Sequence, residues 1–196
     1  MIKKHFFLLI LFPILFSCNE TTVPRPTGYF RIDFPTKVYS VVDTLPFPFQ
    51  FELPQYARPN LERTRKDPNF LNIDFPKYQA RIHLSYVNVD SNVHKLFEDS
   101  RTLVYKHAVK AQDIQENLIS NPKEGVHGMY YLIEGNAASS TQFYLTDSSK
   151  HFLRGALYFN AEPNYDSIAP VLDFLKTDIE HFIESFSWKE SEHNLP

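Results

Sequence analysis

Three runs of mostly apolar residues, separated by short polar turns, fill residues 125–160 (GVHGMYYLIEGNAASSTQFYLTDSSKHFLRGALYFN). We expect strands at 125–134, 140–147 and 151–160. The first two are joined by the small residues GNAAS, and the last two by the polar turn DSSK. Connections this short cannot hold a crossover helix, so neighbouring strands must run antiparallel. The pattern therefore predicts an antiparallel meander.

A further strand is predicted upstream of this meander. Apolar residues stand at every second position from Ala80 to Tyr86, and they alternate with Arg81, His83 and Ser85. A period of two residues is typical of a strand with one buried face and one exposed face. We therefore expect His83 to lie on the polar face and to be exposed to solvent.

Two amphipathic helices are predicted, at about 92–118 and 167–186, because apolar residues recur there every three or four positions. The stripe of the first helix comprises Leu96, Ser100, Leu103, His107, Ala111, Ile114 and Leu118. Strands followed by helices of this kind indicate an α+β fold. We expect an antiparallel β-sheet flanked by two main amphipathic helices, forming one domain over residues 28–188 with a polar tail at 189–196.

The first part of this domain is rich in proline. Nine of the 14 prolines lie between Pro24 and Pro76. Short strands are predicted there at 28–34, 37–42 and 47–53. Because proline cannot donate a hydrogen bond to a strand ladder, these strands should lie at sheet edges or end at bulges. The alternative is a less ordered segment that wraps around the domain.

The N-terminus has the order of a secretory signal. Lys3 and Lys4 are followed by an apolar run at residues 6–16, the small residue Ser17, and Cys18, the only cysteine in the chain. A charged start, an apolar stretch and a small residue before the cleavage site are typical of such signals. A cysteine in the next position resembles a bacterial lipobox.

We therefore expect a lipoprotein signal peptide at 1–17, lipid attachment (palmitate) at Cys18, and a lipidated, proline-rich spacer at 18–27. An uncleaved membrane anchor and a soluble secreted protein are the alternatives. The apolar run has about 11 residues, whereas roughly 20 are needed to span a bilayer.

Composition excludes some classes of partner. The formal net charge is −3, and loss of the two signal lysines would make it −5. Nucleic acids and anionic lipid surfaces attract basic proteins, so we expect no nucleic-acid partner. With a single cysteine the chain cannot form an internal disulfide, so its stability must come from a hydrophobic core.

The sequence contains none of the catalytic or cofactor motifs for which we searched. It has no G-x-G-x-x-G, no phosphate loop, no H-E-x-x-H and no G-x-S-x-G. Ser139 and Ser140 fit a turn better than a nucleophile. The six histidines between signal and tail show no ligand spacing; they are at positions 83, 94, 107, 127, 151 and 181. We expect no catalytic residue, no metal, and no cofactor apart from covalent lipid on Cys18.

Two arginines and one histidine need an explanation. Arg154 shares a strand face with Phe152 and Tyr158, where a buried charge would need a partner. Arg101 could pair with an acidic residue such as Asp99 or Asp147, or face water. A structural ion pair is the favoured interpretation for both arginines, with partner contact as the alternative. His107 falls on the apolar stripe and suits a core position.

Five stretches closely resemble one known family. They are residues 28–35 (GYFRIDFP), 82–86 (IHLSY), 98–107 (EDSRTLVYKH), 135–140 (GNAASS) and 151–159 (HFLRGALYF). The family is that of the gliding motility lipoprotein GldD of the Bacteroidota, and the resemblance extends from the spacer to Trp188. The order of strands and helices also resembles the α/β/α sandwich of PsbP-type proteins.

The resemblance implies lipid attachment at Cys18 and a role in gliding motility alongside type IX secretion, without an established enzymatic activity. Possible partner contacts are the shared polar residues Arg101, His107, Asn136 and Arg154. We expect a membrane-anchored, non-catalytic accessory component that binds other gliding or type IX secretion proteins of the envelope. The alternatives are a periplasmic lipoprotein that binds a lipid, glycan or peptidoglycan fragment, and a periplasmic hydrolase.

The residues after Cys18 bear on location. Residues 19–22 (NETT) contain one acidic residue, whereas lipoproteins exported to the surface in this phylum usually carry an acidic cluster there. We therefore expect the domain to face the periplasm. By analogy with better-known lipoprotein sorting, asparagine at position 19 favours the outer membrane over the inner membrane.

Overall fold

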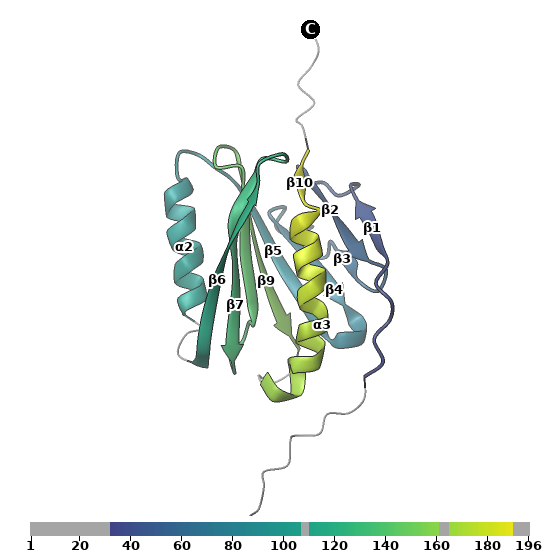
Figure 1. Cartoon of the computed structure of the whole chain (residues 1–196). Helices are drawn as coiled ribbons and strands as arrows, with labels where there is room; N and C mark the ends of the chain where they lie inside the picture. Colours follow the sequence, from purple (N-terminus) through teal and green to yellow (C-terminus); the bar gives the residue numbers. More distant parts are fainter. Residues whose placement is uncertain (1–31, 107–109, 161–164, 190–196) are drawn as a thin grey trace, which may run out of the picture. The chain divides into compact units, whose positions relative to one another are not determined.

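The computed structural model describes residues 32–106, 110–160 and 165–189, which belong to one compact unit, Arg31–Pro196. They form two antiparallel sheets, a short 3₁₀ turn at Pro76–Tyr78, and the helices α2 (Val93–Tyr105) and α3 (Tyr165–Glu184) (Figure 1). In the described ranges, no helix combines the length and the apolar character needed to cross a bilayer.

The larger sheet has seven strands in the order β3-β4-β5-β9-β8-β7-β6, and all neighbours are antiparallel. The strands are β3 (Arg58–Asn60), β4 (Phe70–Phe75), β5 (Ala80–Asn88), β6 (Ala111–Asn121), β7 (Val126–Gly135), β8 (Thr141–Thr146) and β9 (His151–Phe159). Strands β7, β8 and β9 form the predicted meander. On β5 the alternation predicted from Ala80 to Tyr86 is also confirmed, because the apolar residues of this stretch are buried and its polar residues are only partly exposed.

The smaller sheet contains β1 (Tyr39–Val42), β2 (Phe49–Pro54) and β10 (Ser187–Trp188) in the order β1-β2-β10. It confirms the strands predicted at 37–42 and 47–53. The strand predicted at 28–34 is wrong for residues 32–34, which belong to no strand. There Phe34 stacks on Phe174 of α3 with the ring centroids 4.3 Å apart. This segment therefore packs against a helix, as the wrapping alternative suggested.

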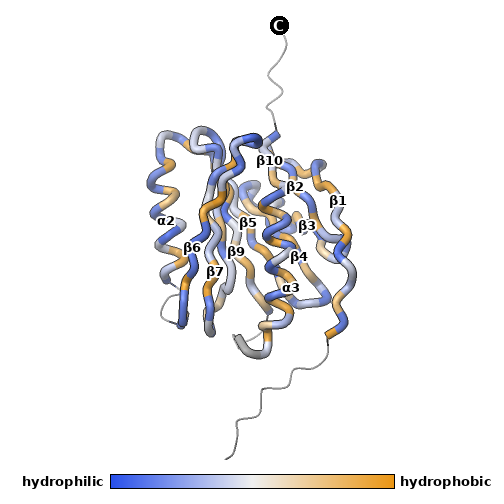
Figure 2. The backbone as a smooth tube through the Cα atoms, viewed as in Figure 1, coloured by the Kyte–Doolittle hydropathy of each residue, from blue (hydrophilic) through white to orange (hydrophobic). Residues whose placement is uncertain are grey.

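The two helices cover opposite faces of the larger sheet. Val104 of α2 packs on Tyr131 and Ile133 of β7. Leu175 and Phe182 of α3 pack in the main core, together with the opposite face of the sheet and with the smaller sheet. Figure 1 shows β6, β7 and β9 between the two helices, and Figure 2 shows that each helix carries both hydrophobic and hydrophilic stretches. The α+β fold and the layered arrangement are therefore as predicted.

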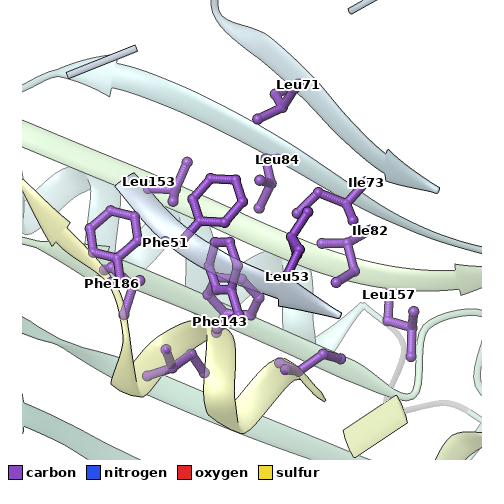
Figure 3. Packing of buried hydrophobic residues seen from close by; sticks show 14 of the residues in the cluster. Phe51, Leu53, Leu71, Ile73, Ile82, Leu84, Phe143, Leu153, Leu157 and Phe186 are labelled. Carbon is purple, nitrogen blue, oxygen red and sulfur yellow. The ribbon is translucent and has the colours of Figure 1, made fainter. Parts of the chain in front are cut away.

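The main core lies between the larger sheet on one side and α3 with β2 on the other. Phe51 from β2 and Phe143 from β8 meet there among aliphatic side chains of β4, β5 and β9 (Figure 3). The ring of Phe143 lies over Gly155, where an added Cβ would come within 2.2 Å of its Cζ atom. Side chains at this density leave no room for a methyl group at position 155.

The long helix predicted at 92–118 is wrong in its second half. Helix α2 ends at Tyr105, and β6 begins at Ala111. A turn that contains Gly125, with a φ of +60°, leads from β6 to β7. The pairing with β7 then outweighs the helical spacing of the few apolar residues, as tertiary contacts often outweigh local pattern. Leu118, which was predicted to be buried on the stripe, is 79% exposed.

Candidate functional site

Arg154 occupies the middle of β9 on the face that α2 partly covers. It lies opposite Ser85 of β5 and Tyr144 of β8. Its Nη2 donates a hydrogen bond to Oε1 of Gln142 at 2.5 Å. Burial lowers the pKa of Arg154 below its usual value. Among the described residues no ion pair of Arg154 is found, and its partner there is a neutral amide.

A groove of about 490 Å³ opens on the same face, over β3, β4, β5 and β9. The polar side chains among its lining residues are Arg58, Asp74, Gln79, Arg81, His83, Tyr158 and Asn160. The strand register brings them together, because Arg81 is the partner of both Asp74 and Tyr158. In the next row His83 pairs with Ala156, two residues from Arg154 on β9.

Asp74 and Arg81 form a bidentate pair at the floor of this groove. Arg81 Nε lies 2.5 Å from Asp74 Oδ1, and Nη2 donates to Oδ2 at 3.1 Å. Asn60 also donates to Oδ2, at 2.8 Å. Burial alone would raise the pKa of Asp74, but these hydrogen bonds and the charges of Arg81 and Arg58 outweigh it and leave the pKa lowered. The carboxylate is therefore ionised and fully engaged.

His83 is also engaged and is not simply exposed, as we expected from sequence. Its Nδ1 lies 2.7 Å from Oδ1 of Asn72. Burial, followed by the charges of Arg81 and Arg63, lowers the pKa of His83. The ring is therefore neutral at pH 7. Because Asn72 Oδ1 can only accept, Nδ1 carries the proton and Nε2 remains as an acceptor.

The groove offers several groups that could contact a ligand. Its acid and its histidine are already paired inside the fold, and its described lining contains no Ser, Thr or Cys that could act as a nucleophile. Arg58 is exposed at the rim and supplies a positive charge, and two aromatic side chains, Tyr158 and Phe159, line the groove as well. An anionic or sugar-like group would find donors and flat apolar surfaces here.

Arg101 lies elsewhere, on α2 beside β6. Its Nε is 3.8 Å from Oε1 of Glu116, and its guanidinium lies 5.2 Å from the centroid of the Tyr105 ring. Tyr105 Oη donates to the same oxygen of Glu116 at 2.7 Å. The predicted partners, Asp99 and Asp147, are not the ones observed. The true partner was missed because position 116 was assigned to a helix.

Of the remaining sequence-predicted residues, Asn136 is described and does not line the groove. Asn136 is exposed in the turn after β7, and His107 and Cys18 lie outside the described residues. Glu116, the partner of Arg101, shares one row across the sheet with Gln142 and His83. With strands about 4.8 Å apart, the four strand spacings in this row separate Glu116 from His83 by roughly 19 Å. Arg101 and the groove are therefore two separate surfaces.

The residues of the groove were largely missed by the sequence analysis, which noted only Arg81 and His83 as polar. Arg58, Asp74 and Tyr158 come from three other strands, and only the register assembles them. The described residues contain no cluster of three or more His, Cys, Asp or Glu side chains that could hold a metal ion.

Replacing Arg154 with alanine should lower the free energy of unfolding by about 1–3 kcal/mol, because Gln142 would be left buried without its partner. Gln142 is 1% exposed, and its Nε2 already lacks a partner. Arg58→Ala, at the exposed rim, is the matched control and should change stability by less than about 0.5 kcal/mol. Denaturant unfolding measures both. If Arg154→Ala keeps full stability yet abolishes motility, Arg154 acts through a partner and not through the fold.

Comparison with known proteins gives the following. The model of the family "Gliding motility lipoprotein GldD" matches residues 19–188. No curated protein sequence matches the chain. Among solved structures, the chain is similar to the solution structure of cyanobacterial PsbP (CyanoP) from Synechocystis sp. PCC 6803. The identity is 11% and the TM-score 0.47, over 89% of this chain and 99% of that one. Since the family match spans most of the sequence, the chain belongs to the gliding motility lipoprotein GldD family.

Proposed function

We propose that this protein is a lipid-anchored, non-catalytic accessory component of the gliding and type IX secretion apparatus. The family match over residues 19–188 carries the proposal, because it implies involvement in gliding motility and a place in the cell envelope. The described surface supports a binding role. In the groove, Asp74 is paired with Arg81, and His83 is hydrogen-bonded to Asn72. Elsewhere, Leu103, Tyr105 and Leu118 leave apolar surface exposed on α2 and β6.

The anchor and its side of the membrane are part of the same proposal. Covalent lipid on Cys18 would attach the domain, and the spacer at 18–27 would separate it from the bilayer. With one acidic residue after the cysteine, the domain would face the periplasm, on the outer membrane. The partners would then be other envelope proteins of the gliding or secretion machinery.

Crosslinked co-purification from the native host tests this role. The protein would carry a tag after Pro196, and mass spectrometry would identify what is recovered with it. Enrichment of gliding or type IX secretion components, compared with an unrelated tagged lipoprotein, is the expected result. Recovery of the protein alone, with working crosslinking controls, would count against an accessory role.

The groove favours one second candidate, a lipoprotein that binds a glycan or peptidoglycan fragment. Its volume of about 490 Å³ lies in the range of small-ligand pockets. Arg58 could contact a carboxylate of such a fragment, and Tyr158 could pack on a sugar ring. For a lipid, a more apolar hollow of about 390 Å³ near Tyr78, Phe159 and Ile168 is better suited. If muropeptides raise the melting temperature of the wild type but not that of Arg58→Ala, the result would support the glycan-binding hypothesis.

A further inference from the structure

Strand β6 is a long, open edge of the larger sheet. It has 11 residues, and β7 is its neighbour on one side. In the described part of the chain no strand pairs with its other side. The opposite edge, β3, has only three residues and contains Pro59. An edge strand presents unpaired N–H and C=O groups, and proteins usually shorten or block such edges. Edge β3 is blocked in this way, whereas β6 is not.

The sequence of β6 contains little that would prevent another strand from pairing with it. Residues 111–121 (AQDIQENLISN) include no proline, lysine or arginine, which are the usual protecting residues. The only irregularity in its pairing with β7 lies at Ala111 and Asp113, at one end. From Asp113 to Asn121 the register is regular. Seven of the 11 residues are exposed, among them Leu118.

Helix α2 supplies a wall beside this edge. Tyr105 and Arg101 both contact Glu116 of β6. The same two side chains line a hollow of about 310 Å³ together with Glu98 and Thr102 of the helix. Tyr105 is 42% exposed. A strand added beside β6 would run along this hollow, and its side chains could cover Tyr105 and Leu118.

The charge of the edge indicates what could be added. Asp113 and Glu116 are the charged residues of β6, so the strand carries two negative charges and no positive one. Like charges placed opposite each other on neighbouring strands destabilise the pairing. In the antiparallel register that pairs residues 111–121 in full with the same residues of a second copy, Glu116 would lie opposite Glu116. A segment without net negative charge avoids this repulsion.

We propose that β6 accepts an extended segment of another protein, without net negative charge, as an additional antiparallel or parallel strand. Such strand addition uses main-chain hydrogen bonds for affinity and side-chain contacts for specificity. Here Leu118 and Tyr105 supply the apolar contacts, and Asp113 and Glu116 select against acidic segments. The inference rests on the proposed accessory role, because it names how this protein would hold a partner.

A pair of proline substitutions tests the pairing itself. In an antiparallel ladder, adjacent residues point their N–H groups in opposite directions. Of Asn117→Pro and Leu118→Pro, one therefore removes a bond to β7, and the other removes an N–H that faces outward. The melting temperature identifies the outward position, because that variant stays close to the wild type. Asn117→Ala and Leu118→Ala keep the N–H group and are the matched controls.

The readout is a crosslink formed in the native host. Benzoyl-phenylalanine placed at Leu118 is irradiated in cells, and peptide mapping identifies the crosslinked segment. The same probe at Val41, which is 58% exposed on β1, is the control site. We expect an adduct from position 118 with a segment of another protein that has no net negative charge. With the probe at Gln115 instead, the outward proline should reduce the adduct at least tenfold, and its alanine control should not.

Three results would overturn the inference. They are an adduct with a second copy of this chain, an adduct with an acidic segment, and an undiminished adduct in the stable proline variant. If neither proline variant folds, the identity of the mapped segment decides. When gliding or secretion proteins co-purify with the tagged chain but position 118 gives no adduct, the edge inference fails and the accessory role stands. When nothing co-purifies, the accessory role itself fails.

Discussion

Replacing Asp178 with asparagine is expected to lower the free energy of unfolding by about 3 kcal/mol, the low end for breaking a buried ion pair. Asp178 lies on α3 and is 2% exposed. Lys37 Nζ and Tyr39 Oη donate to its Oδ1, each at 2.8 Å, and Tyr56 Oη donates to Oδ2 at 2.7 Å. This carboxylate therefore connects the segment before β1, β1 itself and the residues after β2 to the helix.

Asparagine would keep the shape of the side chain but remove the charge and one acceptor. The ammonium of Lys37 would lose its counter-charge while its side chain is only 22% exposed. It would keep the carbonyl of Phe174 at 2.6 Å and some water, which is why we expect the low end of the range. One of the two tyrosines would face an amide N–H, which cannot accept its proton.

Both tyrosines act as donors in the native state. Burial raises the pKa of Tyr39 and of Tyr56 well above the usual value, and the hydrogen bond to Asp178 raises each further. Each phenol therefore keeps its proton across the physiological range. With asparagine in place of the carboxylate, one of the two part-buried hydroxyl groups would need a new acceptor, and an unsatisfied one costs about 1–3 kcal/mol.

Denaturant unfolding of the domain without its signal peptide measures this loss. The matched control is Asp173→Asn on the same helix, because that carboxylate is 69% exposed and lies 3.5 Å from Lys176. Exposed pairs of this kind contribute about 0–1 kcal/mol. Equal losses in the two variants would show that the buried network adds nothing to stability. Faster hydrogen exchange in β1 should accompany the Asp178 variant, since that strand loses its connection to α3.

The fold could be predicted where burial leaves a periodic trace in the sequence. Strand β5 and the meander alternate because one face packs against the core, and α3 carries a continuous apolar stripe. Strand β6 leaves no such trace, since most of it is exposed at the sheet edge. Strand β4 was missed for the opposite reason. Four of its six residues are buried, so burial does not alternate along the strand. Asn72 and Asp74 also interrupt the apolar run, and the sequence therefore shows no clear period.

For the surfaces, the sequence could place single residues on the correct face of a strand but could not identify their partners on other strands. The alternation on β9 placed Arg154 on the correct face, but nothing in the sequence pairs it with Gln142, 12 residues earlier. Asp74 and Arg81 meet because β4 and β5 pair in one register, and a slip of one residue would put them on opposite faces. Glu116 was missed as the partner of Arg101 because residues 111–118 were assigned to a helix and not to β6. Contacts across strands depend on register, which a single sequence does not specify.

Replacing Cys18 with alanine is expected to release the protein from membranes while the domain stays folded. The core lies within Arg31–Pro196, and Cys18 precedes it, so loss of the lipid should leave the melting temperature unchanged. Each buried CH₂ contributes about 0.8 kcal/mol to membrane binding, and stable attachment takes two acyl chains or a second signal. The net charge of the chain is −3, which does not favour attraction to anionic lipid as that second signal.

Fractionation of cells into membrane and soluble parts after a high-salt wash measures the release. Ser17→Ala is the matched control, because it keeps a small residue before the cysteine and should stay in the membrane pellet. Retention of Cys18→Ala in the pellet would contradict lipid anchoring at this residue and favour an uncleaved N-terminal anchor. Motility should be lost together with attachment. A released, folded domain that still supports gliding would show that gliding does not require membrane attachment of this protein.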